Sequence, residues 1–285
     1  MCSVAVNVHS QTVLWPKVHR RNRVKMRTEG IKQYDFSVVS NAKVAKDVYR
    51  MQILAPELAK KLMPGQFINL AAPGDPSHIV RLPLSFASTD SQEGTVELIY
   101  AVVGEGTHRL SHMRVGASST LIGPCGKGWN LSNNRHALLV AGGVGAPPIV
   151  AAARGLKEQG VELCVVLGAR SGERLWGESV LKDMGATVMV TTDDGSYGRQ
   201  GFTTEVVAEL LPGDFGQILT CGPNLMMAGV AALAEKAKIN CQASLERMMT
   251  CGFGACHTCN VAMRAGGYKF CCTDGPVFDA KEVAW

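Results

Sequence analysis

The chain has 285 residues, of which 46% are hydrophobic and 19% charged, and its formal net charge is +5. This length and balance describe an ordinary globular protein with room for two domains, a small module and a sizeable core. No run of about 18 apolar residues occurs, which excludes a membrane-spanning helix and leads us to expect no membrane partner.

Residues 1–32 form a basic extension, in which no acidic residue stands before Glu29. Its lysines and arginines are Lys17, Arg20, Arg21, Arg23, Lys25 and Arg27. The extension has little aromatic interleaving and no nucleic-acid-binding module, so we expect no nucleic-acid partner. No apolar segment follows Arg20-Arg21, as an export signal would require. We expect a poorly ordered arm or an over-called start site.

Ten cysteines occur in the chain, and four of them form the C-terminal motif described below. The other six are scattered among apolar or strand-like neighbours: Cys2, Cys125, Cys164, Cys221, Cys241 and Cys271. In a chain of this size without an export signal, this usage indicates reduced thiols rather than disulfides. The expected location is therefore the cytoplasm.

Residues 33–134 carry short segments of alternating polarity, punctuated by Gly, Pro, Asp and Ser. This pattern predicts an antiparallel barrel or sandwich of about 100 residues. Two stretches stand out, RLPLSF at 81–86 and VVGEGTHRLS at 102–111. Ser85 could hydrogen-bond a ring nitrogen, and Thr107 at a glycine-flanked turn could hold a phosphate. Each stretch could equally be plain turn chemistry.

Residues 135–240 alternate four apolar runs with four helical stretches. The predicted strands are 136–141, 161–168, 186–192 and 217–222, and the predicted helices are 147–159, 172–184, 202–211 and 224–238. Such alternation predicts a parallel, doubly wound sheet. The first strand runs into VAGGVGAPPIV, where glycines at a helix start allow a pyrophosphate to approach. Those glycines are Gly142, Gly143 and Gly145, with Pro147 in the first helical turn.

Cys221, Gly222 and Pro223 follow the fourth strand of this sheet. Ligands of open α/β sheets bind at the carboxyl ends of strands, so this tripeptide is a second candidate for nucleotide contact. Cys221 could also be an ordinary core thiol.

The C-terminal segment 241–285 holds the most specific motif. Cys251, Cys256 and Cys259 have the spacing C-x4-C-x2-C, and a fourth cysteine stands about a dozen residues later. This is the plant-type spacing for a [2Fe–2S] cluster. Gly252 and Gly254 permit the left-handed backbone that turns amides toward sulfur. A zinc site or plain buried cysteines are the alternatives, and His257 between the ligands is expected to face solvent.

Cys271 and Cys272 are adjacent, and in a strand neighbouring side chains face opposite sides, so only one of them can face the cluster. The residues alone leave this choice open.

Taken together, RLPLSF, GEGT, GGVGAPP, CGP, GPCGKGW, DGSYGRQGFTTEV, LERMMTCGFGACHTC and CTDGPVF resemble the ferredoxin–NADP reductase superfamily. Within it, the chain from Gln33 onward is most similar to the electron-transfer subunits of NAD-linked dihydroorotate dehydrogenase. The resemblance implies a fold of three parts: an FAD-binding antiparallel β barrel, a doubly wound α/β nucleotide domain and a small [2Fe–2S] module. It also implies Cys272, just before Thr273-Asp274-Gly275, as the fourth cluster ligand.

The resemblance assigns residues to three cofactors. On the FAD motifs fall Arg81, Pro83, Leu84, Ser85, Ile99, Tyr100, Gly106 and Thr107. On the NAD motifs fall Gly142, Gly143, Gly145, Cys221, Gly222 and Pro223. The cluster ligands are Cys251, Cys256, Cys259 and Cys272. Ser85 and Cys221 are the candidate catalytic residues, placed beside the flavin and the nicotinamide.

The implied partner is an FMN-containing catalytic subunit that oxidises dihydroorotate, in a heterotetramer of two plus two. Electrons would cross the cluster and FAD to NAD+. Met248, Met249 and Phe253, beside the cluster loop, could contact that partner or could belong to the core.

Two departures point to an alternative. Arginine is common just before the position of Pro83 in this family, but here that place is Leu82 and the arginine is Arg81. Cys125 stands where leucine is usual. Flavin subunits of ferredoxin:NADP transhydrogenases and sulfide dehydrogenases have arginine at the Arg81 place, so a reductase subunit of transhydrogenase, sulfide dehydrogenase or sulfite reductase type is the alternative function.

The preferred nucleotide is expected to be NAD(H), from the resemblance. The sequence is ambiguous here, because Arg170, Ser171 and Arg174 after the second strand could grip a 2′-phosphate. No acidic residue stands at that strand end for a ribose hydroxyl.

Overall fold

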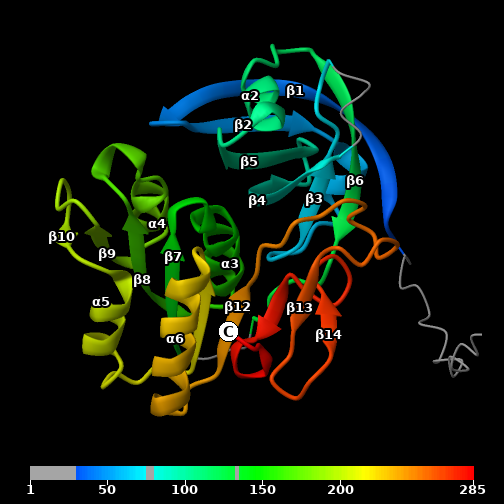
Figure 1. The fold of residues 1–285 in the computed structure, drawn as a ribbon. Coiled ribbons are helices and arrows are strands. Elements are labelled where there is room, and N and C mark those ends of the chain that lie inside the picture. Colours follow the sequence, from blue (N-terminus) through cyan, green and yellow to red (C-terminus); the bar gives the residue numbers. More distant parts are fainter. Residues whose placement is uncertain (1–29, 75–79, 132–134) are drawn as a thin grey trace, which may run out of the picture.

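The computed structural model describes residues 30–74, 80–131 and 135–285. The predicted basic extension lies outside these residues except for its last three positions. Three parts are visible along the chain (Figure 1): a barrel, a parallel sheet flanked by helices, and a C-terminal module between them. Among the described residues, no helix is long and apolar enough to cross a membrane.

The first part is a closed antiparallel barrel, which resolves the choice between barrel and sandwich. Its strands are β1 (Lys32–Ala45), β2 (Val48–Leu54), β3 (Phe67–Leu70), β4 (Leu82–Asp90), β5 (Thr95–Ala101) and β6 (Ser118–Cys125), in the order β1-β2-β5-β4-β3-β6. Alternate residues such as Met51, Ile53 and Leu98 fill its interior, because successive strand residues face opposite sides. Two short helices, α1 (Pro56–Ala59) and α2 (Glu105–Ser111), cover its ends.

One expectation in the barrel was wrong. Thr107 does not lie in an open turn, because α2 begins at Glu105 and places Thr107 in its first helical turn. The Thr107 hydroxyl accepts hydrogen bonds from the Val103 and Gly104 amides at 3.0 and 3.2 Å. The residue therefore caps its own helix, as short polar side chains often do at N-termini.

The second part is a doubly wound sheet, as predicted. Its strands are β7 (His136–Gly142), β8 (Glu162–Ala169), β9 (Thr187–Thr192), β10 (Arg199–Gln200), β11 (Gln217–Cys221) and β12 (Cys241–Ser244), with β15 (Val277–Asp279) at one edge, in the order β10-β9-β8-β7-β11-β12-β15. All pairs are parallel except β12–β15. The sheet thus continues past residue 240, because β12 joins it from the segment that was assigned to the cluster module.

The helices of this part largely match the predicted stretches. They are the turn η1 (Gly143–Gly145), α3 (Ala146–Glu158), the turn η2 (Gly172–Arg174), α4 (Glu178–Asp183), α5 (Thr203–Leu210) and α6 (Asn224–Ala237). The predicted helix over 172–184 is broken into η2 and α4. The break occurs at Gly177, whose φ of 104° is incompatible with a right-handed helix.

The C-terminal module consists of a long loop, a hairpin of β13 (Asn260–Ala262) and β14 (Tyr268–Phe270), strand β15 and the turn η3 (Ala280–Glu282). The adjacent Cys271 and Cys272 follow β14 and lie in a turn rather than in a strand. The argument from strand alternation was therefore wrong for them, and their orientation depends on the turn.

The module is packed into the rest of the molecule rather than attached by a linker. One core cluster joins barrel residues Phe67 and Cys125 with sheet residues and with the module's Cys259, Cys271 and Cys272. The loop that carries the predicted cluster ligands therefore has a fixed place against both other parts.

Candidate functional site

The barrel meets the parallel sheet through the strands that carry the unusual barrel motifs. α3 packs against β4, and η1 lies against β5. Pro83, Leu84 and Ser85 are half-buried on β4, the strand on which α3 packs. The structure thus brings the predicted ring-binding and phosphate-binding motifs to one interface, although they are far apart in the sequence.

Ile99 and Tyr100 face opposite sides of β5. The Ile99 side chain is buried in the core cluster shared with α3 and the sheet. The Tyr100 side chain is buried in the barrel interior, where its hydroxyl donates to Asn41 Oδ1 at 3.1 Å. Only the Tyr100 backbone is left for contact with a ligand at the interface, while Ile99 points toward it.

Arg81 lies just before β4 and is held by the barrel itself. Its guanidinium donates to the Thr120 carbonyl at 3.2 Å, to the Thr120 hydroxyl at 3.2 Å and to Gln33 Oε1 at 3.3 Å. Desolvation lowers the pKa of Arg81 from its ordinary value, although the group stays charged at neutral pH. A role for Arg81 toward a phosphate would require it to exchange these partners.

The two nucleotide motifs interlock at the carboxyl edge of the sheet. A Cβ at Gly145 would overlap the Cys221 carbonyl, and one at Gly222 would lie 2.9 Å from the Gly142 amide nitrogen. Backbone therefore packs on backbone, which only glycine allows. The GGVG and CGP motifs, about 80 residues apart in a sheet of this order, form one cradle at the N-terminus of α3.

The Cys221 thiol beside this cradle is protonated at neutral pH. Burial raises its pKa to about 12, and a hydrogen bond with Ser244 only partly opposes this effect. It is therefore no thiolate nucleophile, and its placement suits packing beside a bound ring.

The predicted cluster ligands form two neighbouring pairs, Cys251 with Cys256 and Cys259 with Cys272. The Cys251 sulfur accepts from the amides of Ala255 at 3.3 Å and Cys256 at 3.5 Å. The Cys259 sulfur lies 3.3 Å from the Cys272 sulfur and accepts from the Cys272 amide at 3.4 Å. Gly252 and Gly254 have φ values of 77° and 90°, as the loop requires. Two pairs of sulfurs with amides directed at them suit a cluster of two tetrahedral irons.

Two thiols of this loop, those of Cys256 and Cys259, have lowered pKa values. Partial burial opposes ionisation of Cys256, but hydrogen bonds from Thr258 lower its pKa to about 6. A hydrogen bond from Cys272 lowers the pKa of Cys259 to about 6, and the pKa of Cys272 is raised in turn because it donates that bond. Thiolate is the form that binds metal, so the donor chemistry fits an iron site.

Cys271 is separated from these sulfurs. It is fully buried, its sulfur lies 3.6 Å from the Leu245 carbonyl, and burial raises its pKa to about 12. His257, between the ligands, is exposed and stacks on Phe270 with ring centroids 4.2 Å apart. In residues 30–74, 80–131 and 135–285, no group of three or more His, Cys, Asp or Glu side chains is arranged around a single metal ion.

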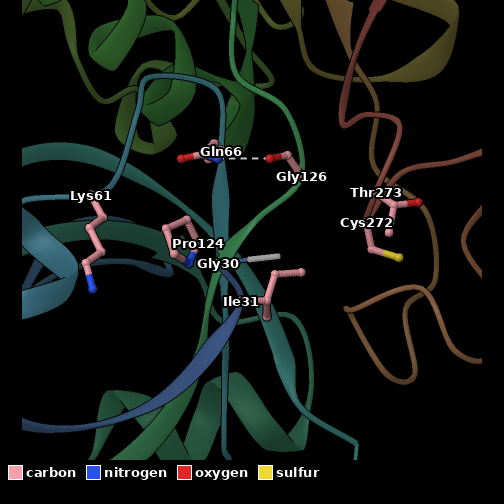
Figure 2. A pocket seen from close by; sticks show the side chains of 8 residues that line it. All are labelled: Gly30, Ile31, Lys61, Gln66, Pro124, Gly126, Cys272 and Thr273. Atoms are coloured by element: carbon pink, nitrogen blue, oxygen red, sulfur yellow. Dashed lines mark hydrogen bonds between the residues drawn. The ribbon is translucent and has the colours of Figure 1, made fainter. Parts of the chain in front are cut away.

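A cavity of about 250 Å³ separates the barrel from the cluster module (Figure 2). Cys272 and Thr273 line it on the module side, and Lys61, Gln66 and Pro124 line it on the barrel side. Gln66 donates to the Gly126 carbonyl at 2.9 Å across one wall. One predicted ligand therefore borders a space that opens between the two parts.

A second cavity, of about 700 Å³, lies at the carboxyl ends of β8 and β9. Ser171, Glu173, Glu178, Asp194 and Tyr197 are among its lining residues, and among the described residues that line it there is no lysine or arginine. These acidic lining residues were not predicted from the sequence. The motif TTDDGSYG, directly after the third parallel strand, was the signal that could have revealed them.

Arg174 is turned away from this cavity toward the barrel. Its guanidinium pairs with Asp47, at the tip of the β1–β2 hairpin, at 2.7 Å. The adjacent pair Lys46–Glu173 is 2.6 Å long, and the Lys46 amide also donates to the Glu173 carbonyl at 2.7 Å. A grip of Arg174 on a 2′-phosphate, which the sequence left open, would therefore compete with an existing ion pair.

Comparisons with known proteins agree with this arrangement. Residues 246–284 match the iron–sulfur cluster binding domain of dihydroorotate dehydrogenase B, and residues 35–129 match an oxidoreductase FAD-binding domain. The chain is 35% identical to a dihydroorotate dehydrogenase B (NAD+) electron transfer subunit of Fusobacterium nucleatum over 87% of its length and 97% of that protein. It is 37% identical to the Listeria innocua subunit of the same name over 88% and 99%.

The fold is also similar to a solved NADH-dependent reduced ferredoxin–NADP oxidoreductase. The TM-score is 0.80 and the identity 33%, over 87% of this chain and 89% of that one.

Proposed function

The chain belongs to the family of dihydroorotate dehydrogenase B (NAD+) electron transfer subunits, and we propose from this premise how its residues serve electron transfer. It is an oxidoreductase subunit with an FAD-binding barrel, an iron–sulfur cluster and NAD+ as electron acceptor, and it serves pyrimidine biosynthesis. A nicotinamide exchanges two electrons as a hydride, a cluster carries one, and a flavin can do both. The three sites must therefore lie in the order cluster, flavin, nicotinamide.

One observation carries this proposal: the barrel strands with the flavin motifs touch both other sites. β4 and β5 face α3 and η1 on one side, and β3, the neighbour of β4, packs against the cluster loop on the other. The barrel thus contacts both a two-electron site and a one-electron site.

The electron balance follows from this order. Oxidation of one dihydroorotate to orotate releases two electrons and two protons. Two single electrons enter this chain at the cluster site, and together with one of those protons they convert NAD+ to NADH. The second proton is released. This chain itself is proposed to bind no dihydroorotate.

We propose specific residues for each group. Pro83, Ser85 and Ile99 would border the FAD ring, with Ser85 offering its hydroxyl to a ring nitrogen. Leu84, whose side chain packs against the barrel interior, would contribute its backbone. Gly106 and Thr107, in the first turn of α2, would face the phosphates, as would Arg81 after exchanging its present partners, and Tyr100 would contribute backbone. The cradle of Gly142, Gly143, Gly145, Cys221, Gly222 and Pro223 would hold NAD. Cys251, Cys256, Cys259 and Cys272 would hold the cluster.

The partner is a catalytic dihydroorotate dehydrogenase subunit, for which we propose an FMN cofactor and a complex of two plus two. The outer side of the cluster loop supports a docking surface there, because Cys256 is exposed and Met248 is 80% exposed. Phe253 is half-buried, and Met249 is only 7% exposed, so it belongs to the core. A cytoplasmic location stays a prediction from cysteine usage.

The preference for NAD(H) gains support from the acidic cavity. We place the adenosine end of a nucleotide held by the glycine cradle in this cavity, whose lining includes Glu173, Glu178 and Asp194. Hydrogen bonds from Ser196 lower the pKa of Asp194, so it is charged at neutral pH. Glu173 and Glu178 are paired with Lys46 and Lys182 at 2.6 and 2.7 Å, so Asp194 is the carboxylate that would accept bonds from a ribose hydroxyl and repel a 2′-phosphate.

The test is reconstitution of the full chain with iron, sulfide and flavin. We expect flavin and cluster absorption, FAD rather than FMN on acid release, and a higher kcat/KM for NADH than for NADPH in dye reduction. Release of FMN, or the absence of cluster bands after reconstitution, would refute the assignment.

A second candidate has a specific observation in its favour. The similar reduced ferredoxin–NADP oxidoreductase matches in fold over most of both chains, so a reductase subunit of that type is the alternative. Co-purification identifies the partner: an FMN-containing dihydroorotate dehydrogenase supports the first function. A different flavin subunit, together with preference for NADPH, supports the second.

A further inference from the structure

Asn69 is a polar side chain at the contact between the barrel and the cluster loop. It lies on β3, where Ile68 and Leu70 point into the barrel interior. Phe67 points outward and packs with the cluster-module cysteines. Because side chains alternate along a strand, Asn69 shares the outward face with Phe67. It is completely buried there.

The Asn69 amide is bonded directly to a proposed cluster ligand. Its Nδ2 donates to the main-chain carbonyl of Cys251 at 3.2 Å. The next residue, Gly252, has a φ of 77°, and a Cβ at that position would overlap Asn69 Nδ2. The glycine that shapes the cluster loop is therefore also the residue that lets the loop approach the barrel this closely.

The other half of the Asn69 amide is unusual. Its Oδ1 atom is buried and accepts no hydrogen bond among the described residues. A buried acceptor without a partner lowers the free energy of unfolding by roughly 1–3 kcal/mol. A leucine of similar size would fill the same space without an unpaired acceptor. Leucine would remove this cost but would also remove the bond to the Cys251 carbonyl, so the two effects on stability oppose each other and give little net reason for an asparagine at this position.

The strand that carries Asn69 leads to the flavin motif. Asn69 pairs with Pro83 on β4, and Phe67 pairs with Ser85. A continuous path then runs from the Cys251 carbonyl through the Asn69 side chain into β3 and across the ladder to β4. Its two ends are the proposed cluster ligand and the strand proposed to border the flavin.

We propose that Asn69 is a positioning residue for electron transfer: it fixes Cys251 against the barrel and completes a bonded route between the cluster site and the flavin site. This inference rests on the proposed function. Electrons cross the route one at a time, two for each NAD+ reduced, and no proton or bond is exchanged at Asn69.

The experiment compares Asn69→Leu with the wild-type chain after reconstitution with FAD and the cluster. Gln52→Leu is the matched control, since Gln52 makes one side-chain hydrogen bond, to Thr95 at 3.0 Å, on the outer face of β2 and β5 rather than on β3, which contacts the cluster loop. Stopped-flow absorption after mixing with NADH follows flavin reduction and then cluster reduction. Electron paramagnetic resonance of the reduced cluster reports the surroundings of its ligands.

We expect Asn69→Leu to unfold near the wild-type temperature, because loss of the bond to the Cys251 carbonyl offsets removal of the unpaired Oδ1 acceptor, and to reduce its flavin at the wild-type rate. Cluster reduction should be several-fold slower, and the resonance of the cluster should be shifted. The Gln52→Leu control should show neither change. Cluster reduction at the wild-type rate with an unaltered resonance would overturn the inference.

Two further outcomes are informative. If Asn69→Leu does not retain its cluster, the isosteric Asn69→Asp, which lacks the amide donor, replaces it: slowed cluster reduction supports the inference and a wild-type rate overturns it. If the wild-type chain itself binds no FAD or cluster, the proposed function fails, which is distinct from a failure at Asn69 alone.

Discussion

The barrel touches the rest of the molecule in two contrasting ways. Toward the cluster module its contact is buried: Phe67, Asn69 and Cys125 are at most 3% exposed. Toward the nucleotide domain, at the tip of the β1–β2 hairpin, the contact consists of two ion pairs whose side chains are between 38% and 56% exposed. Figure 1 shows this hairpin extending from the barrel toward η2 and α4.

The difference matches what each contact has to do. Single electrons must cross a fixed separation many times, which favours close packing that resists change. A nucleotide must enter and leave at each turnover, which favours exposed charges that part at little cost. The barrel is thus closely packed on the cluster module, and through β4 on α3, whereas the tip of the β1–β2 hairpin beside the nucleotide cavity is held by exposed ion pairs and a main-chain hydrogen bond.

The largest effect should come from the cluster ligands, on the buried side. Replacing Cys251, Cys256, Cys259 or Cys272 by serine should abolish or strongly weaken the cluster absorption, because each removes one thiolate donor. Cys271→Ser is the matched control, since its sulfur faces the Leu245 carbonyl. A cluster kept in Cys272→Ser and lost in Cys271→Ser would reverse the assignment of the fourth ligand.

A smaller effect is expected from Gly252→Ala. Gly267→Ala provides the control, because Gly267 has nearly the same φ, 78°, but no atom within 4 Å of an added Cβ. The control should lose about 1–2 kcal/mol of unfolding free energy from backbone strain alone. Gly252→Ala should lose at least about 1 kcal/mol more from its overlap with Asn69. Equal losses in chemical denaturation would show that the buried contact is not tightly packed.

On the exposed side, Asp47→Asn should change nucleotide preference rather than stability. It releases the guanidinium of Arg174, which follows the cavity residue Glu173. We expect kcat/KM for NADPH to rise a few-fold relative to NADH. Arg174→Ala, which breaks the same ion pair without supplying a free cation, should not produce this rise, and an equal rise in both variants would contradict the explanation.

The smallest effect should be on folding. Arg174→Ala should change the free energy of unfolding by about 1 kcal/mol or less, because exposed ion pairs are weak. The difference from wild type should shrink further as salt screens the charges. A large, salt-independent loss in denaturant titrations would mean that the hairpin contact is as rigid as the buried one.

Much of the fold could be predicted because its signals are local. The alternation of strands and helices after His136 and the punctuated strands before it reflect periodicity within short windows. Where local signals were mixed, prediction failed. The stretch 172–184 has helical residues around Gly177, whose positive φ divides it, and the stretch around Thr107 contains turn residues that a helix uses as its first turn.

The sequence by itself predicted the loop of Cys251, Cys256 and Cys259 and each of the two glycine motifs, because each depends on a spacing within one short segment. The meeting of the two glycine motifs in one cradle was decided by the sheet, which brings β7 and β11 side by side. The sequence could not reveal the contacts of Asn69 and Asp47. Their partners, Cys251 and Arg174, lie 182 and 127 residues away, and a lone asparagine or aspartate carries no pattern. The packing of barrel, sheet and module also decided two orientations. It determined which of Ile99 and Tyr100 faces the interface, and which of Cys271 and Cys272 faces Cys259, since burial selects one face and excludes the other.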